Sequence, residues 1–387
     1  MKIFNKGKWK KVKLGDVCDK VISGEWGTEV DENSQNTAFI IRTTNFSNNG
    51  KIDIENKELV KRKIDEIKIK EKSLKKGDII IEKSGGSSNQ PVGRVVYFNL
   101  DTNDIFLCNN FTSILRINEK INSKYIFYFL RNSYKNNKVI KYQNKTTGII
   151  NLKLKDYLKE NYLFLPKLEI QNKIVNILDN LEILLEKNQK YLIYLKELNK
   201  SLFITFNKNG IEKRLDDIAD ISMGQSPLSQ SYNIDKKGLP FYQGKTEFGD
   251  IYIKEPIIYC NSPIKIVEKN DILMSVRAPV GDVNIATQKS CIGRGLASIR
   301  AKKVDYLYLF YLLKERKIKI EKMGVGSTFK AINKNNISSL QIPIIEMSKQ
   351  NRIKKYLLLI EKLSFEIENS IKEAENLYNS LMNKYFE

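Results

Sequence analysis

Histidine is absent from all 387 residues, and cysteine is scarce. Without an imidazole, the chain has no Ser-His-Asp or Cys-His catalytic arrangement, no histidine metal site and no ordinary general base for neutral pH. The four cysteines, Cys18, Cys108, Cys260 and Cys291, lie far apart with no C-x-x-C pair. This spacing argues against a zinc ribbon and against a dense disulfide framework. We therefore expect no metal site, a reducing cytoplasmic setting and little chemistry by this chain alone.

Long apolar runs and phosphate-binding glycine loops are also missing. No stretch of about 18 uncharged apolar residues occurs, so we expect a soluble protein with no membrane span. No G-x-x-x-x-G-K-[ST] loop and no G-x-G-x-x-G between a strand and a helix is present, and GVGSTFK at 324–330 has only an isolated G-x-G. The sequence therefore gives no support for cofactor binding by this chain.

Acidic residues are outnumbered by basic ones, with 45 Asp and Glu against 66 Lys and Arg and a net charge of +21. Such a charge favours a polyanionic partner, either nucleic acid or an anionic membrane face. The alternative is a basic surface that is only solvated. Part of the lysine excess fits codon bias, because Asn, Ile and Lys are all abundant.

The second half of the chain repeats motifs of the first half in the same order. The junction LPKLEIQNKIVNIL at 165–178 is echoed by IPIIEMSKQNRIKKYLLLI from residue 342 onward. Collinear repeats of this kind indicate a tandem duplication of a whole domain together with its exit helix. The other pairs are KLGDVCD (13–19) and RLDDIAD (214–220), KKGDIII (75–81) and EKNDILM (268–274), PVGRV (91–95) and PVGDV (279–283), SILRI (113–117) and SIRAK (298–302), and YIFYFL (125–130) and YLFYLL (308–313).

Each copy is rich in predicted strands before its exit helix. Short β-branched or aromatic runs such as FIIRT, GDIIIEK and GRVVYF are bounded by Gly, Pro, Asn and Asp, and helix-like stretches such as SKYIFYFLRN lie between such runs. A length of 387 residues also exceeds one typical core. We predict an α+β fold with globular domains at 1–165 and 209–343, each followed by a long helix, at 166–208 and 344–387.

Both exit segments place apolar residues on a seven-residue period, which is typical of a coiled coil. A lone helix of this length would expose its apolar stripe, so we predict that the two helices pack on each other. The alternative is that each stripe packs back on its own globular domain. Asn188, a polar residue in an apolar row, would fix the register of the pair. The predicted seam is Ile174, Leu178, Leu181, Leu185, Asn188, Leu192 and Leu195 in the first helix, and Ile353, Leu357, Ile360, Ile367, Ile371, Tyr378 and Leu381 in the second.

With these motifs the chain resembles the specificity subunit of type I restriction-modification systems, usually called HsdS. The likeness covers nearly the whole chain in the order domain, helix, domain, helix. The first half departs more, with GEWGTEV where the second half has GQSPLSQ. The most specific parts are the two L/I-P…Q-N-K/R-I junctions and, in the second half, MGQSPLSQSYN (223–233), GLPFYQGKTEFG (238–249), SVRAPVGDVNIA (275–286), CIGRGLASIR (291–300) and GSTFKAINKNNI (326–337).

The resemblance implies a non-catalytic subunit that recognises double-stranded DNA. Two target-recognition domains would each read one half of a split sequence, held apart by an antiparallel pair of helices. Two methyltransferase subunits would dock on this scaffold and bind S-adenosylmethionine, and restriction subunits would bring ATP- and Mg-dependent translocation and cleavage, so this chain would hold no cofactor. In agreement, the sequence has no N/D-P-P-Y/F motif, no Walker loop and no credible cluster of nuclease carboxylates.

Recognition chemistry indicates which loops would read the DNA. Short polar side chains and Arg or Gln forks distinguish base edges, whereas Lys and backbone amides hold phosphates. The candidate loops are rich in Gly, Ser, Thr, Gln and Arg, and such residues are also typical of ordinary turns and solvated surface. The predicted DNA-binding residues are Gln225, Ser226, Gln243, Lys245, Arg277, Arg294, Ser327, Thr328 and Lys330 in the second domain, and Arg42, Thr43, Ser84, Ser87, Arg94, Asn109, Asn110, Lys145 and Thr147 in the first.

Two other classes of function stay open at the level of sequence. An autonomous DNA- or RNA-binding module would act without methyltransferase partners, and copurification with a methyltransferase subunit would separate it from a specificity subunit. A self-sufficient enzyme would show activity as the isolated chain. The sequence does not give the DNA target or the spacer length.

Overall fold

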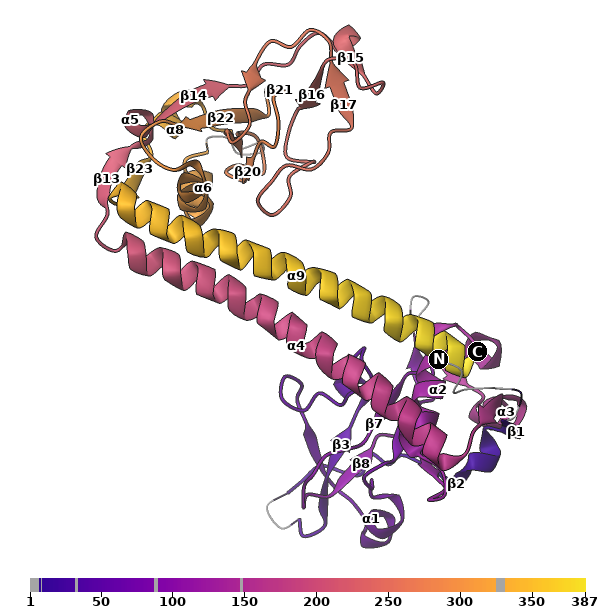
Figure 1. The fold of residues 1–387 in the computed structure, drawn as a ribbon. Coiled ribbons are helices and arrows are strands. Elements are labelled where there is room, and N and C mark those ends of the chain that lie inside the picture. Colours follow the sequence, from indigo (N-terminus) through magenta and orange to yellow (C-terminus); the bar gives the residue numbers. More distant parts are fainter. Residues whose placement is uncertain (1–6, 8, 32–33, 87–89, 147–148, 325–330) are drawn as a thin grey trace. The chain divides into compact units, whose positions relative to one another are not determined.

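The computed structural model describes residues 7, 9–31, 34–86, 90–146, 149–324 and 331–387, with only the backbone of 145 and 146. Contacts divide the chain into two compact units. Unit 1 is residues 1–188 together with 370–387, and unit 2 is residues 189–369. Each unit therefore contains one globular domain and one part of each long helix (Figure 1).

Unit 1 is built on a four-stranded antiparallel sheet in the order β2-β9-β5-β7. A second sheet, β4-β3-β8, contains the parallel pair β3 and β8, and smaller sheets are β10-β11-β6 and β1-β12. The elements are β1 (Lys10–Lys13), β2 (Cys18–Ser23), β3 (Thr37–Ile41), β4 (Val60–Lys63), α1 (Glu66–Lys72), β5 (Ile79–Glu82), β6 (Ser84–Gly86), β7 (Val95–Tyr97), β8 (Phe106–Cys108), β9 (Thr112–Ile117), α2 (Ser123–Lys135), β10 (Gln143–Thr146), β11 (Ile149–Leu152), α3 (Leu154–Glu160), β12 (Tyr162–Leu165) and α4 (Leu168–Asn207), which continues into unit 2.

Unit 2 repeats this plan. Its four-stranded antiparallel sheet has the order β14-β22-β19-β20, and a second sheet, β15-β17-β16-β21-β18, contains the parallel pair β16 and β21. The predicted α+β fold with an internal repeat is confirmed. The elements are β13 (Ile211–Arg214), α5 (Leu215–Ile218), β14 (Ala219–Met223), β15 (Tyr232–Asn233), β16 (Leu239–Tyr242), β17 (Ile258–Cys260), β18 (Ile266–Val267), β19 (Ile272–Ser275), β20 (Val283–Ile285), β21 (Ser290–Ile292), β22 (Leu296–Ala301), α6 (Tyr306–Glu315), α7 (Lys317–Lys322), α8 (Lys334–Ser338), β23 (Gln341–Ile344) and α9 (Met347–Phe386), which ends in unit 1.

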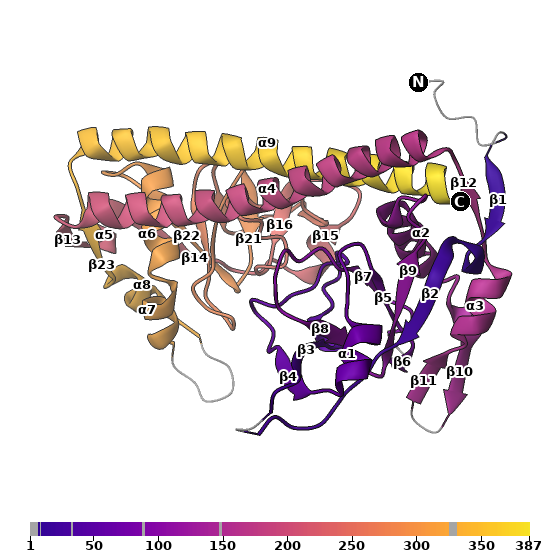
Figure 2. The ribbon, with the colours of Figure 1, turned by 90° about the horizontal axis from the view of Figure 1, so that it is seen from below.

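One buried helix lies against the four-stranded sheet of each unit. The side chain of Asn122 caps α2 by accepting two backbone N–H groups of its first turn, and Asp305 caps α6 in the same way. Figure 2 shows α2 between its sheet and the end of α9. There the rings of Tyr125 and Phe386 lie 5.1 Å apart. These aromatic helices therefore join each sheet to the long helices.

The two long helices pack against each other within each unit (Figure 1). In unit 1, Ile174 near the start of α4 shares a core with Tyr385 near the end of α9. In unit 2, Phe203 near the end of α4 shares a core with Leu357 near the start of α9. Early residues of one helix thus meet late residues of the other, and the predicted antiparallel packing is confirmed.

The predicted seam residues differ in burial. Asn188 is 7% exposed, and its side-chain amide donates to the hydroxyl of Ser370 at 3.0 Å. Ile174 and Ile353 also contribute to the cores of the globular domains, so the seam residues near the start of each helix face both a domain and the other helix. Buried seam positions are Ile174, Leu178, Asn188, Ile353, Leu357, Ile360 and Leu381, and half-buried ones are Leu181, Leu185, Leu192, Leu195, Ile367, Ile371 and Tyr378.

A buried glutamine fastens the start of each long helix. Gln171 is 2% exposed; its Oε1 accepts from the N–H of Asn122 at 2.9 Å, and its Nε2 donates to the carbonyl of Pro166 at 2.8 Å. Gln350 is 1% exposed and joins the N–H of Asp305 to a carbonyl in the same way, at 3.0 and 2.7 Å. The repeated Q-N-K/R-I motif therefore supplies the amide that ties the long helix to the segment before the buried helix.

Replacing Gln171 or Gln350 with alanine should destabilise the unit that contains it by about 1–3 kcal/mol, because two buried backbone groups lose their partners. Hydrogen exchange read by mass spectrometry separates the two units. Gln189→Ala, at an exposed position of α4, is the control and should change stability by less than about 0.5 kcal/mol. Exchange equal to that of the unaltered protein in both glutamine variants would show that the amides do not hold the junction.

Candidate nucleic-acid interface

Four of the predicted residues meet at one edge of unit 2. Gln225 follows β14, and its N–H donates to the carbonyl of Ile292 at 3.1 Å. Gln243 follows β16, and Arg294 lies in the turn between β21 and β22, where its N–H donates to the hydroxyl of Ser226 at 3.2 Å. The side chains of Gln225, Gln243 and Arg294 are exposed. The structure thus brings strand ends from distant parts of the sequence into one polar edge.

Glycines make this edge possible because the backbones touch there. A Cβ on Gly224 would lie 2.2 Å from the carbonyl oxygen of Gly293, and a Cβ on Gly295 would lie 2.3 Å from the carbonyl oxygen of Gln243. Real Cβ atoms do not approach that closely, so larger residues would force the loops apart. The close backbone contacts therefore hold the side chains next to these glycines together at this edge.

Other predicted residues of unit 2 lie beside this edge. Arg277 follows β19, is exposed and forms an isolated bridge with Ala331. The ammonium of Lys245 pairs with Asp282 at 2.6 Å, and Lys317 pairs with the same carboxylate at 2.5 Å. Burial alone would raise the pKa of Asp282, but these two ammonium groups lower it below its usual value. Ser327, Thr328 and Lys330 lie outside the described residues.

Unit 1 has an edge built in the same way. The N–H of Glu25 donates to the carbonyl of Cys108 at 2.8 Å, as Gln225 does in unit 2. A Cβ on Gly24 would lie 2.0 Å from the carbonyl oxygen of Asn109, so a side chain is excluded here as at Gly224. Arg42 and Thr43 follow β3, and Asn109 and Asn110 lie between β8 and β9. These positions match the turns that carry Gln243 and Arg294.

Several predicted residues of unit 1 already have partners within the chain. Arg94 pairs with buried Glu82 at 3.0 Å and donates to the backbone of Thr43 at 3.3 Å. Arg42 donates to the carbonyl of Glu58 at 2.9 Å. Both arginines therefore stabilise the loops. Ser84 begins β6, Asn110 is exposed, Lys145 has only its backbone described, and Ser87 and Thr147 lie outside the described residues.

Asn109 is 5% exposed, and its Oδ1 is buried without a hydrogen-bond partner among the described residues. A lone buried acceptor costs free energy, and strained or unsatisfied polar groups often lie at functional sites. Asn109 lies in the turn between β8 and β9 at the edge of unit 1, and its unpaired oxygen is consistent with a functional site there.

The sequence did not single out a basic and aromatic cluster beside the edge of unit 1. The guanidinium of Arg62 lies 4.5 Å from the ring centre of Trp26. Glu25 pairs with Lys68 at 3.2 Å and with Lys72 at 2.8 Å, and its pKa is lowered chiefly by the hydrogen bond from Lys72. The dense Lys and Arg run at 60–72 was the available signal, but a charge run is usually a solvated face.

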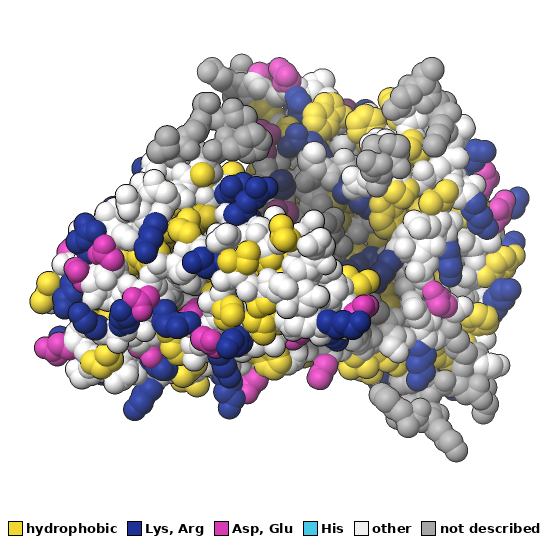
Figure 3. All heavy atoms as spheres, turned by 90° about the horizontal axis from the view of Figure 1, so that it is seen from above, with side chains coloured by type: hydrophobic (Ala, Val, Ile, Leu, Met, Phe, Trp, Pro, Cys, Tyr) yellow, Lys and Arg dark blue, Asp and Glu magenta, His cyan; other side chains and the backbone are white. Residues whose placement is uncertain are grey.

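Basic side chains are not gathered in one place on the face drawn in Figure 3, where lysine and arginine are spread among acidic and apolar side chains. The net charge alone therefore does not locate the site. Among the described residues, no helix is long and apolar enough to cross a membrane, and no group of three or more Cys, Asp or Glu side chains is placed to hold a metal ion. Burial raises the pKa of the Cys18 thiol to about 12 and that of Cys108 to about 11, so neither is a reactive thiolate.

Comparison with known proteins decides the family. The model of the type I restriction modification DNA specificity domain matches residues 6–195 and 207–375, one match for each copy of the repeat. The chain belongs to this family. It is a specificity subunit of a type I restriction-modification system, and its domains are DNA-recognition domains.

Individual relatives agree with this assignment. A putative type I restriction enzyme specificity subunit, MjaX of Methanocaldococcus jannaschii, is 38% identical over 333 residues, which cover 79% of this chain and 77% of that protein. The S subunit of a type I system from M. genitalium has the same fold, with a TM-score of 0.63, 15% identity and coverage of 100% of this chain and 98% of that one. A chain from a type I R-M system solved for its complex assembly and conformational transition has a TM-score of 0.57, 24% identity and coverage of 98% and 97%.

Replacing Gly224 with alanine should weaken binding to the target duplex by about tenfold or more, because the loops that carry Gln225 and Arg294 must separate. Fluorescence anisotropy with target and scrambled duplexes measures the loss. Gly244→Ala is the matched control on the same edge, since no atom lies within 4 Å of its added Cβ, and it should bind as the unaltered protein does. Full target preference in the Gly224 variant would show that the close backbone contact is not required.

Proposed function

We propose that each globular domain reads one half of a split DNA target and that the two long helices set the spacing between the halves. The observation that carries the proposal is the occurrence of one glycine-lined edge in both copies, with different side chains at matching positions. Gln225 in unit 2 corresponds to Glu25 in unit 1, and the turn of Arg294 corresponds to that of Asn110. One backbone design with two sets of side chains suits two half-sites of different sequence.

The exposed side chains of unit 2 have the chemistry of base readers. A glutamine amide forms a fork with adenine, and a guanidinium forms one with guanine, both in the major groove. Gln225, Gln243 and Arg294 are therefore assigned to bases. Lys245 is assigned to a phosphate, which its ammonium would bind after its ion pair with Asp282 breaks. Contacts to phosphate orient the protein on the duplex and carry no sequence information.

The remaining predicted residues fall into two groups in this proposal: residues that stabilise the edge, and residues predicted to contact DNA directly. Arg94, Arg42 and Asn109 shape the rim of unit 1 through their contacts within the chain. Predicted direct contacts to DNA are Ser226, Arg277, Ser327, Thr328 and Lys330 in the second domain and Thr43, Ser84, Ser87, Asn110, Lys145 and Thr147 in the first.

The long helices provide the docking surface for other subunits. Large apolar side chains stay exposed along them, including Ile193 at 55%, Tyr194 at 59% and Phe365 at 62%. Exposed apolar patches commonly mark protein interaction sites. Two methyltransferase subunits dock here and bind S-adenosylmethionine, restriction subunits bring ATP and Mg, and this chain performs no catalytic step. Copurification with a methyltransferase subunit tests this part of the proposal.

Arg294→Ala should relax or change one base pair of one half-site, because a bidentate arginine contact is worth about 1–3 kcal/mol of discrimination. Methylome sequencing of a host that carries the complete system reads the motif. Lys289→Ala removes an exposed cation from the turn before β21 and should leave the motif unchanged. If Arg294→Ala also left it unchanged, this edge would not be a base reader.

The purified subunit alone, without methyltransferase subunits, tests whether this chain catalyses methyl transfer. Incubated with DNA and S-adenosylmethionine, it should transfer no methyl group. Methyl transfer by the isolated chain would contradict the non-catalytic role.

Lengthening both helices by one heptad should lengthen the gap between the half-sites and leave their sequences unchanged. Insertions after Asn188 in α4 and after Asn369 in α9 fall at the unit boundaries and keep the apolar period. Seven residues add about 10 Å at about 1.5 Å per residue, or about three base pairs. Two-residue insertions at the same points would rotate the apolar row by about 200°, at about 3.6 residues per turn, and should abolish assembly. An active heptad variant with the old gap would show that the helices are not the spacer.

A further inference from the structure

The two copies place the same residues at the junction between the buried helix and the long helix. The hydroxyl of Tyr125 donates to the carbonyl of Phe164 at 2.8 Å in unit 1, and that of Tyr308 lies 3.2 Å from the equivalent carbonyl of Pro343 in unit 2, with Asn207 Oδ1 as its closer acceptor. Positions equally far from Tyr125 and Tyr308, or from Gln171 and Gln350, are therefore equivalent. By this correspondence Glu182 matches Glu361, Arg131 matches Lys314, Tyr128 matches Tyr311, and Tyr378 matches Asn199.

In unit 1 the carboxylate of Glu182 has two donors. The guanidinium of Arg131 pairs with it, and the hydroxyl of Tyr378 donates to it at 2.9 Å. The hydroxyl of Tyr128 lies 3.1 Å from the same carboxylate and 2.5 Å from that of Asp179, which is the closer acceptor for its one hydrogen. Arg131 also lies over the rings of Phe127 and Tyr128. A guanidinium thus fills the space between α2, α4 and α9.

In unit 2 the equivalent carboxylate has lost its donors. Among the described residues, Glu361 makes no ion pair or hydrogen bond, and burial raises its pKa. The ammonium of Lys314 turns away and donates to the carbonyl of Asp250 at 3.0 Å. Asn199 replaces the longer tyrosine, and its Oδ1 is buried with no hydrogen-bond partner in the described part of the chain. Two acceptors, one of them charged, therefore lack donors at the place where unit 1 holds a guanidinium.

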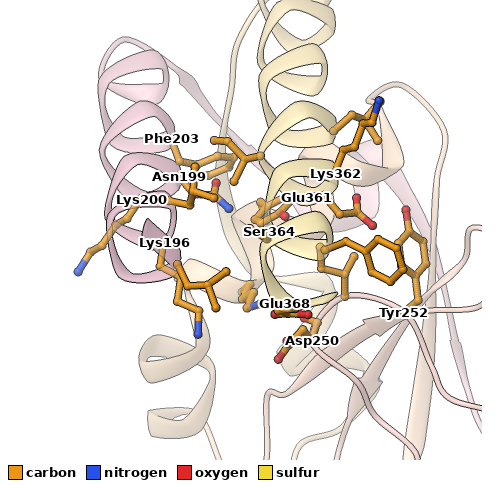
Figure 4. Close-up of a pocket in the computed structure, with 18 of the residues that line it drawn as sticks. Lys196, Asn199, Lys200, Phe203, Asp250, Tyr252, Glu361, Lys362, Ser364 and Glu368 are labelled. Atoms are coloured by element: carbon orange, nitrogen blue, oxygen red, sulfur yellow. Dashed lines mark hydrogen bonds between the residues drawn. The ribbon is translucent and has the colours of Figure 1, made fainter. Parts of the chain in front are cut away.

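A pocket of about 840 Å³ opens beside these acceptors, between the unit 2 parts of α4 and α9, α6 and the loop at 250–252. Figure 4 shows Glu361 extending from α9 toward Tyr252 and Asn199 extending from α4 toward α9. The apolar walls include Phe203, Tyr252 and Tyr311. The pocket thus combines a carboxylate, an amide oxygen and aromatic faces.

We propose that this pocket binds a guanidinium group, namely the side chain of an arginine presented by a partner protein. A guanidinium is planar, carries five N–H donors and stacks on aromatic rings, so it satisfies both acceptors and uses the aromatic walls at once. An ammonium is a more strongly hydrated point charge and has less to gain from such walls. The inference rests on the proposed function only in that a subunit of a multi-subunit complex has protein partners to present the arginine.

The test uses the full-length protein with N-acetyl-L-arginine methylamide as the probe and ligand-observed NMR as the readout. The neutral, isosteric citrulline derivative is the reference compound. Because the chain carries a charge of +21, cations have no general affinity for it, and a saturable signal reports a site. We expect saturable binding of the arginine probe and about tenfold weaker binding of the citrulline derivative, since charge-assisted hydrogen bonds are lost.

Variants assign the signal to the pocket. Glu361→Gln should weaken probe binding about tenfold or more, and Lys314→Arg should abolish it by filling the pocket from within, as Arg131 does in unit 1. Glu361→Gln should leave the melting temperature unchanged or raised because it removes an unpaired, partly buried charge. Glu182→Gln, which breaks a paired carboxylate, should lower the melting temperature and leave probe binding intact.

No saturable binding to the unaltered protein, or equal binding to the Glu361→Gln variant, would overturn the proposal. The methylated motif, read separately, reports on DNA recognition. Loss of probe binding with an unchanged methylated motif would therefore contradict the arginine site alone and leave the proposed function standing.

Discussion

The buried amide at the start of each long helix is the contact on which the rest of the structure depends. Gln171 and Gln350 each join a backbone N–H from the segment before the buried helix to a carbonyl from the segment after the last strand. Hydrogen bonds are directional, whereas apolar packing is not. The amide therefore fixes the direction in which the helix leaves its domain, and only a helix with a fixed direction can present its apolar stripe to an antiparallel partner.

Periodic features were predictable from the sequence, because the spacing of apolar residues determines which face an element buries. The α+β elements and the packing of the two long helices on each other follow from that spacing, the repeat follows from the collinear motifs, and the antiparallel arrangement was implied by the resemblance. Gln225, Gln243 and Arg294 were singled out from their polar loops, but their meeting at one edge was not predicted. The internal use of charges was not predictable. Arg94 was predicted to bind DNA, but it pairs with Glu82, which ends a strand of otherwise apolar residues. Lys245 was also predicted to bind DNA, but it pairs with Asp282, which lies on a turn distant in the sequence. Pairing of this kind depends on tertiary proximity, which one sequence does not encode in any local pattern.

The two copies separate what folding requires from what can vary. Gly24 and Gly224 occupy places where no side chain fits, and the junction glutamines satisfy buried groups, so these positions are constrained by packing. The residues directly after the glycines differ: Gln225 is exposed, whereas Glu25 is half-buried and pairs with Lys68 and Lys72. A rim whose side chains change while its backbone contacts stay the same permits a new DNA target at little cost to stability. The same divergence, inside unit 2, left Glu361 without the donors that Glu182 has.

The composition of unit 1 has a consequence for synthesis of the chain. Its core includes Leu381, Met382 and Tyr385 from the end of α9, whereas unit 2 consists of consecutive residues. Domains generally fold in the order in which they leave the ribosome. Here the first domain to emerge waits with its aromatic helix α2 partly uncovered until the last turns of α9 are made, so the second domain completes its core first. The core of the domain that is translated first is therefore completed by residues at the end of α9.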